Sequence, residues 1–206
     1  MTRIRPVRPD DHEALAEICV RTGAAGADAT GAHSSDGLLP DLFVLPYAAR
    51  HPDFCFVLGD DAGDDAGVRG PRGYVVGTPD TAAFETWFAE QWWPARRGRY
   101  ATPAGVRDAR DAEMIAYADA RGTVPAPYAA TYPAHLHVDL LPDAQGRGAG
   151  RALVERFCDA LALGGVGGVH LVADAQNAGA LAFYDRLGFT RLPSGSGEQA
   201  FGRALP

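Results

Sequence analysis

The most regular pattern of hydrophobic and polar positions lies between residues 134 and 173. It begins with AHLHVDL, in which polar and apolar residues alternate as they do in a β-strand. The glycine-rich sequence QGRGAG follows, a helical periodicity then covers residues 152–162, and residues 169–173 form the continuous apolar run of a buried strand. We therefore predict strand, turn, helix and strand in this order. His135, His137 and Asp139 share one face of the first strand, which we expect to lie outside the core.

Shorter elements are predicted on both sides of this segment, separated by clusters of Gly, Pro, Ser and Asp. Before it we expect a strand at 4–8, a helix from Asp10 or Asp11 to about Arg21, a helical segment at 41–49, and an antiparallel strand pair at 54–58 and 73–76. After it we expect a helix that ends at Gly188, a strand from Phe189, and a last strand at the edge of the sheet.

Two more helices are predicted within residues 78–132. Asp80 or Thr81 caps the first, which Pro94 and Gly98 are expected to stop, and the second covers 108–121. Aromatic residues follow helical spacing in the first helix, and they form either a local packing face or a wall over a pocket: Phe84, Trp87, Phe88, Trp92 and Trp93.

The amino-acid composition limits the number of domains, the location and the chemistry that we expect of this protein. A chain of 206 residues with 47% hydrophobic content predicts one domain. No run of about 18 apolar residues is present, so we expect a cytoplasmic protein with no membrane partner. A net charge of −7 disfavours nucleic acid as a partner, and the 19 basic residues are all arginine, which excludes a lysine Schiff base or a P-loop lysine. The three cysteines are expected to be small buried hydrophobes.

The turn QGRGAG brings backbone N–H groups together at the start of a helix, where an anion such as a pyrophosphate is favoured. A dinucleotide-binding Rossmann unit would need Gly-x-Gly-x-x-Gly. Counting from Gly146 the third position is Arg151, and counting from Gly148 it is Leu153, so the fingerprint fails in both frames. Asp174 nevertheless lies about 20 residues on, where the ribose-binding acid of such a unit would be, so this alternative stays open.

Two motifs resemble those of the GCN5-related N-acetyltransferases (GNAT). Gln145, Gly148 and Gly150 match the pattern Gln/Arg-x-x-Gly-x-Gly/Ala, and Asn177, Tyr184 and Gly188-Phe189 match the second motif of that family. The sequences GTPDTAAFETWF, EQWWPA and YPAHLHVDLLPDAQGRGAGR, together with the long segment before the glycine-bearing strand, are similar to a bacterial subgroup related to the acetyltransferase-like C-terminal domain of O-GlcNAcase.

The resemblance implies a single α/β (α+β) N-acetyltransferase domain over residues 1–206. Its mixed, mostly antiparallel central sheet would be flanked by helices, with a helical insertion at about 79–132 before the cofactor-binding strand. Acetyl-CoA would enter a V-shaped opening between the strand ending at Leu141 and the strand ending at Ala173. The cofactor-binding residues implied are Leu140, Leu141, Gln145, Gly146, Arg147, Gly148, Ala149, Gly150, Asn177, Phe183 and Tyr184.

The resemblance also implies catalytic roles. Tyr184 is the candidate general acid for the departing thiolate, and Asp139 or His137 would take the amine proton directly or through water. Asp174 would anchor a cationic substrate or share the role of base. For each of these residues a purely structural role is the alternative. A metal site at His-x-His-x-Asp is not expected, because no further ligand is indicated.

The predicted function is acetyl-CoA-dependent N-acetyl transfer to a primary amine by direct attack in a ternary complex. The alternative is an acetyl-CoA-binding module without catalysis. The acceptor would be a small molecule or a peptide, with no metal, and the protein would be a monomer or a homodimer.

Overall fold

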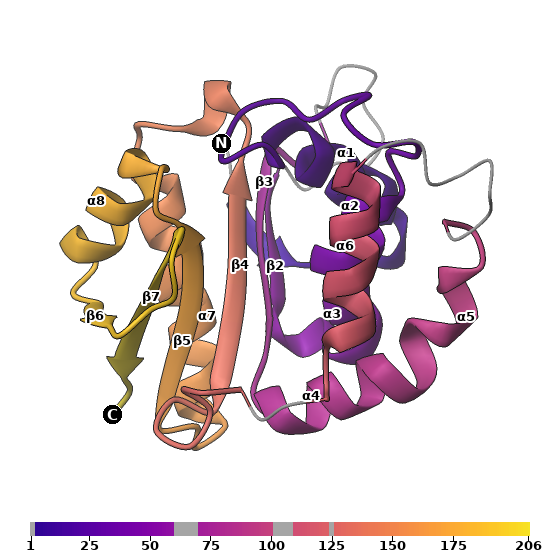
Figure 1. Ribbon diagram of the computed structural model, residues 1–206. Coiled ribbons are helices and arrows are strands. Elements are labelled where there is room, and N and C mark those ends of the chain that lie inside the picture. The colour runs from indigo at the N-terminus through magenta and orange to yellow at the C-terminus, as the bar shows by residue number, and fades with distance from the viewer. Residues whose placement is uncertain (1–2, 60–69, 101–108, 124–125) are drawn as a thin grey trace.

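A seven-stranded sheet forms the centre of the molecule in the computed structural model, which describes residues 3–59, 70–100, 109–123 and 126–206 (Figure 1). Neighbouring strands are antiparallel except β4 and β5, which are parallel. The order across the sheet is β1 (Arg3–Pro6), β2 (Cys55–Gly59), β3 (Gly73–Thr78), β4 (Ala134–Leu140), β5 (Gly168–Asp174), β7 (Glu198–Ala204) and β6 (Thr190–Leu192). The predicted mixed, mostly antiparallel sheet is confirmed, and a parallel Rossmann sheet is excluded.

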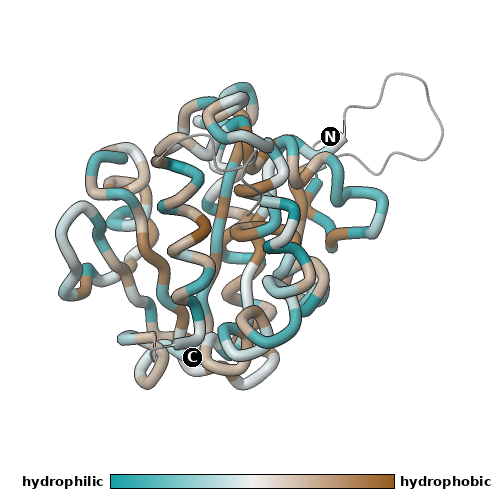
Figure 2. The backbone as a smooth tube through the Cα atoms, turned by 45° about the vertical axis from the view of Figure 1, so that its right-hand side comes forward, coloured by the Kyte–Doolittle hydropathy of each residue, from teal (hydrophilic) through white to brown (hydrophobic). Residues whose placement is uncertain are grey.

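Helices cover both faces of this sheet. On one face α7 (Ala149–Leu163) packs on β2, β3 and β4, and α8 (Ala178–Arg186) adds Tyr184 to the same apolar cluster, as does Leu187 directly after it. On the other face lie α1 (His12–Thr22), α2 (Leu38–Phe43), α3 (Leu45–Arg50), α4 (Thr81–Trp87), the π-helix η3 (Phe88–Trp92), α5 (Pro94–Arg97) and α6 (Ala109–Ala120). Figure 2 shows hydrophobic positions on the central strands and hydrophilic ones on the peripheral loops. Within the described ranges no helix is both long and apolar enough to cross a bilayer.

The parallel pair β4 and β5 separates soon after it starts. Their register holds only two pairs, Ala134 with Val169 and His135 with His170. Beyond these pairs the two strands diverge, which gives the predicted V-shaped opening toward Leu140 and Asp174 (Figure 1). Backbone groups of β4 that face this opening are left without a strand partner on that side.

The helical segment expected at 41–49 is two helices, because the chain breaks at Val44. A continuous helix would pair the carbonyl of Leu42 with the N–H of residue 46, which is a proline and has none. The Leu42 carbonyl instead accepts a hydrogen bond from Arg121 Nη1 at 2.9 Å.

The prediction that Pro94 and Gly98 stop the first helix within residues 78–132 is right for Gly98 and wrong for Pro94. The wider π turn, with Trp93 N bonded to Phe88 O at 2.9 Å, lets Pro94 begin α5, and Gly98 ends it.

The last strand is not at the edge, contrary to the prediction. β7 pairs with β5 over seven positions and buries Phe201, so the short β6 forms the edge instead.

Three short 3-10 turns complete the described elements: η1 (Pro9–Asp11), η2 (Pro52–Phe54) and η4 (Pro142–Ala144). Of the two predicted caps of the first helix, Asp10 and Asp11, Asp11 occupies the N-cap position of α1 but makes no capping hydrogen bond to it with its side chain. Its carboxylate instead accepts the Arg8 N–H at 2.7 Å, ahead of η1. Asp80 does cap α4, since its carboxylate accepts the Ala83 N–H at 3.0 Å. All three cysteines are buried, as predicted.

Candidate active site

The glycine-rich turn leads from the end of β4 into α7. Gly146 and Gly148 both have positive φ, 78° and 79°, which L side chains rarely adopt. Gly148 is the residue before the first turn of α7, so the free N–H groups of that turn open beside the end of β4. The Gln145 side chain donates from Nε2 to the Leu140 carbonyl at 2.8 Å and holds the turn against the strand.

A cavity of about 540 Å³, which we call the turn cleft, opens between this turn, β4 and α8. Eight of the eleven residues predicted to bind the cofactor line it: Leu140, Gln145, Gly146, Gly148, Gly150, Asn177, Phe183 and Tyr184. A Cβ at Gly150 would lie 3.2 Å from the Phe183 ring, so glycine lets α7 approach α8 closely. The structure therefore brings most of the two sequence motifs to one cleft.

The other three predicted residues lie elsewhere. Arg147 and Ala149 line a separate cavity of about 660 Å³ on the opposite side of the turn, beside β1 and β2. The Leu141 side chain is only 2% exposed and belongs to the core on the side of α1. Asn177 lines the turn cleft but also caps α8, because its Oδ1 accepts the Ala180 N–H at 3.0 Å.

A third cavity, of about 730 Å³, lies on the α1 and α6 side of the same strands. We call it the acceptor cavity, after the role that is proposed for it below. The loop after α1 supplies His33, α6 supplies Arg110, Glu113 and Met114, and the diverging strands β4 and β5 form a further part of its wall. Residues of α1, α2 and α8 also line it. The turn cleft and the acceptor cavity share six lining residues: Thr22, Val138, Asp139, Asn177, Ala180 and Tyr184.

Asp139 lies where the two cavities meet. Its carboxylate accepts a hydrogen bond of 2.6 Å from the Tyr74 hydroxyl, which reaches it from the neighbouring strand β3. Burial raises the pKa of Asp139, while the hydrogen bond from Tyr74 acts in the opposite direction. A carboxylate with these surroundings is a better proton acceptor than an exposed one.

Tyr184 lies at the same junction, on α8. Its ring packs against Phe189 and Phe201 and is 7% exposed, and its hydroxyl has no hydrogen-bond partner among the described residues. Burial raises the pKa of Tyr184 above its ordinary value, and the negative charge of Asp139 adds to the rise. The phenol is therefore protonated at neutral pH.

The face that carries the two histidines is covered, contrary to expectation. His135 is 8% exposed, and its two ring nitrogens contact the Tyr47 hydroxyl at 2.7 Å and the Thr81 hydroxyl at 2.9 Å. Polar residues are compatible with a core position here because helices α3 and α4 bring a hydrogen-bond partner to each nitrogen. His137 is partly buried, contacts the Tyr47 hydroxyl at 3.1 Å through Nε2, and lines the acceptor cavity.

Asp174 ends β5 and lines the acceptor cavity with an exposed side chain. One of its oxygens accepts the Gln176 N–H at 2.7 Å, which shapes the loop before α8. Across the described residues no three His, Cys, Asp or Glu side chains form a group that could hold a metal ion.

The aromatic residues of the insertion form a packing cluster. Phe84, Phe88, Trp92 and Trp93 are 0–7% exposed, and none of them lines the acceptor cavity. The neighbouring arginines are held by carboxylates: Arg97 pairs with Asp119 at 2.7 Å, and Arg96 and Arg99 approach Asp41 at 3.4 and 3.5 Å. The insertion contributes residues of α6 to the wall of the acceptor cavity, and its tryptophans do not line this cavity.

Sequence reasoning missed four residues around this site. Tyr74 bonds Asp139, Tyr47 bonds both histidines, Glu113 lines the acceptor cavity, and buried Arg121 lies beside Tyr47. A run of β-prone residues suggested a strand at 73–76, but nothing local indicated which residue of another strand would face Tyr74.

Comparisons with known proteins agree with this geometry. The family model described as "Acetyltransferase (GNAT) family" matches residues 71–189, more than half of the chain. The crystal structure of SsHAT is 43% identical with a TM-score of 0.87, and the match covers 98% of this chain and 97% of that one.

Two further matches have lower sequence identity. Protein O-GlcNAcase of Rattus norvegicus is 24% identical over 187 residues, 90% of this chain, but the chain spans only about a fifth of that relative, 20%. A GNAT superfamily phosphinothricin acetyltransferase from Sinorhizobium meliloti, solved in complex with AcCoA, shares the fold with a TM-score of 0.57 at 14% identity, over 99% of this chain and 88% of that one. The two motifs, the sheet and the family match together show that the chain belongs to the acetyltransferase (GNAT) family.

Proposed function

We propose that this chain is an acetyl-CoA-dependent N-acetyltransferase that acts on a primary amine. The observation that carries the proposal is the junction of the two cavities, because Asp139 and Tyr184 line both of them. A donor in the turn cleft and an acceptor in the other cavity would meet between a partly buried carboxylate and a buried phenol. Such proximity is what direct transfer in a ternary complex requires.

Acetyl-CoA fits the turn cleft by its chemistry. The N–H groups of Gly148 to Gly150 and the start of α7 suit a pyrophosphate, and the two positive-φ glycines keep side chains away from it. The β4 backbone at Val138 and Asp139 has no strand partner toward β5, so its polar groups on that side are available to a pantetheine arm. The acetyl-CoA complex of the S. meliloti neighbour supports this assignment.

The transfer forms a C–N bond and breaks the C–S bond of the thioester. Asp139 takes the proton from the attacking amine, and Tyr184 gives its proton to the departing sulfur. The two steps assist each other, because the charge of Asp139 contributes to the high pKa of Tyr184. Protonation of Asp139 removes that charge and makes Tyr184 the stronger acid when the thiolate forms. The proton on Asp139 then returns to the phenolate.

The acceptor cavity suits a cationic molecule. Among the described residues, three carboxylates line it, Glu113, Asp139 and Asp174, against one guanidinium, that of Arg110. A molecule with a second positive charge beside the reacting amine would be drawn into this cavity. A small polyamine-like molecule and a basic peptide both have this character. The cavity is not closed by the tryptophans of the insertion, which favours catalysis over binding alone.

The proposal is tested by acetyl transfer to a panel of amines, measured as thiol release, with Tyr184→Phe and Asp139→Asn beside the wild type. Each variant should lower kcat about 10²-fold or more and leave acetyl-CoA affinity unchanged. Tyr128→Phe is the matched control, because its hydroxyl bonds the Pro193 carbonyl outside both cavities. Binding of acetyl-CoA without transfer to any amine would instead identify a non-catalytic module.

A further inference from the structure

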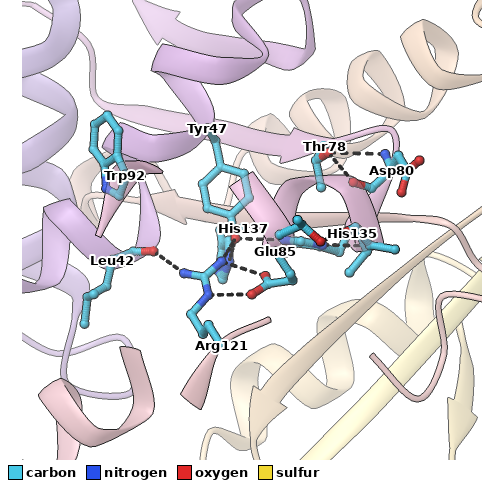
Figure 3. A network of polar contacts seen from close by, with 12 residues as sticks. Leu42, Tyr47, Thr78, Asp80, Glu85, Trp92, Arg121, His135 and His137 are labelled. Atoms are coloured by element: carbon cyan, nitrogen blue, oxygen red, sulfur yellow. Dashed lines mark hydrogen bonds and ion pairs between the residues drawn. The ribbon is translucent and has the colours of Figure 1, made fainter. Parts of the chain in front are cut away.

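The Tyr47 hydroxyl lies between the imidazoles of His135 and His137 (Figure 3), and His137 lines the acceptor cavity. Its oxygen is 2.7 Å from His135 Nε2, 3.1 Å from His137 Nε2 and 3.5 Å from Arg121 Nη2. A tyrosine hydroxyl has one proton to donate and two lone pairs to accept with. Which nitrogen receives that proton decides the tautomer of both histidines.

The position of the protons can be deduced from Thr81, at the far end of the network. The Thr81 hydroxyl lies 2.7 Å from the Pro133 carbonyl and 2.9 Å from His135 Nδ1. A carbonyl only accepts, so the Thr81 proton must lie on the contact with Pro133. The Thr81 oxygen then accepts from His135 Nδ1, which therefore carries a proton.

His135 is neutral and has no second proton. Burial lowers its pKa well below the ordinary value, and the positive charge of Arg121 is among the neighbours that add to this effect. Its Nε2 is consequently a bare lone pair. The Tyr47 proton points to this nitrogen, which agrees with the shorter of the two contacts, 2.7 Å.

The Tyr47 oxygen then accepts from the two remaining neighbours. Arg121 donates because a guanidinium has no acceptor. Its position is fixed by two hydrogen bonds to Glu85, at 2.8 and 2.7 Å, and by the face of Phe88 at 3.7 Å. The other donor must be His137 Nε2–H. Burial and the charge of Arg121 lower the pKa of His137 to about 3, so this ring is also neutral and its Nδ1 is a bare lone pair.

His137 Nδ1 has no hydrogen-bond partner among the described residues, and the ring lines the acceptor cavity two residues along β4 from Asp139. We propose that Thr81, His135 and Tyr47 are positioning residues that lock His137 in the Nε2–H tautomer and so present its Nδ1 lone pair to the acceptor amine. This inference rests on the proposed acetyl transfer, because it needs the amine to enter this cavity.

The fixed tautomer of His137 affects which amines the site prefers as substrates. A neutral primary amine has two N–H groups and one lone pair. One N–H would donate to Asp139 and the other to His137 Nδ1, which leaves the lone pair directed at the thioester. A secondary amine lacks one of these donors. The pair Asp139 and His137 thus favours primary amines of otherwise equal shape.

The direct test is the tautomer itself, measured on the full chain labelled with ¹⁵N-histidine by long-range ¹H–¹⁵N correlation at neutral pH. The six histidines are assigned with single His→Gln variants. The proposal predicts that His135 is protonated on Nδ1 and His137 on Nε2. Protonation of His137 on Nδ1 in the wild type would overturn it, whatever the variants do.

Tyr47→Phe tests the functional part, with Tyr100→Phe as control because Tyr100 is also buried and its hydroxyl bonds Asp41 at 2.7 Å, away from the histidines. Tyr47→Phe should remove the tautomer preference of His137 and lower kcat/KM about tenfold, as expected for one lost positioning hydrogen bond, with an unchanged acetyl-CoA affinity. Equal kcat/KM values in the two variants would contradict the proposal. Absence of acetyl-CoA binding or transfer in the wild type would instead contradict the proposed function.

Discussion

The Tyr74 hydroxyl donates a hydrogen bond of 2.6 Å to the carboxylate of Asp139, its direct partner across the β3–β4 register. The phenol is buried completely and belongs to the core on the α1 side of the sheet, whereas Asp139 lies at the junction of both cavities. A core residue thus sets the proton affinity of a group in the site. Burial raises the pKa of Asp139, and this hydrogen bond limits the rise.

Tyr74→Phe should therefore raise the pKa of Asp139 further, because burial remains while a hydrogen bond to the charged form is lost. The proposed base is active above its pKa, so the acid limb of the kcat/KM profile should move to higher pH. The measurement compares wild type, Tyr74→Phe and Tyr100→Phe with one acceptor, so that ionisation of the acceptor cancels. An acid limb that stays in place would exclude Asp139 as the base.

Folding stability should fall below pH 6.5 because of the buried histidines. The folded pKa of His137 is lowered to about 3, whereas an unfolded histidine titrates near 6.5. Between these values the unfolded chain binds more protons, so stability is lost as the pH falls. From pH 7.5 to 5.5 the loss from this one group is about 1.4 kcal/mol.

Denaturant unfolding of wild type and His137→Gln at both pH values measures this loss. The variant should lose about 1.4 kcal/mol less than the wild type over the same interval, since glutamine does not titrate. An equal loss in both proteins would mean that His137 is not held neutral by the fold.

Gly77 marks a close approach between β3, β4 and α7. A Cβ there would lie 2.3 Å from the His135 carbonyl oxygen and 2.4 Å from the Phe157 ring. Gly77→Ala should reduce the free energy of unfolding by about 1–3 kcal/mol or more, because backbone and a core ring would both have to move. Gly167→Ala is the control, since nothing lies within 4 Å of its added Cβ. Equal stability of the two variants in denaturant unfolding would refute this packing.

Local sequence patterns predicted the parts of the fold that local physics determines. Alternating polar and apolar residues predicted β4, the glycine-rich sequence predicted the turn, and the continuous apolar run predicted β5. The separation of β4 from β5 came from the family resemblance. Long-range contacts could not be predicted from such local patterns. The burial of His135, for example, depends on Tyr47 and Thr81, which come from two other helices and meet it only in the folded chain.

The same limit applies to the site. Asp139 and Tyr184 stood out because they lie in recognisable motifs, but the pairing of Tyr74 with Asp139 needs the register of two strands separated by more than fifty residues. Leu141 follows the end of β4, and only its packing shows that the side chain turns into the core. The tail PSGSGEQAFG predicts a hairpin that ends in an edge strand, but the seven pairs that hold this strand inside the sheet are formed with the distant β5.

Isothermal titration with acetyl-CoA measures whether the glycine turn binds this co-substrate. Gly148→Glu puts a charged side chain at φ 79°, and Gly165→Glu does the same at φ 73° beyond the other end of α7, with open space at both positions. The two variants therefore share the backbone strain and the added charge. We expect micromolar-range binding in the wild type and in Gly165→Glu, and its loss in Gly148→Glu at a matched melting temperature. Binding by Gly148→Glu as tight as that of the wild type, or no binding in any of the three proteins, would contradict the account.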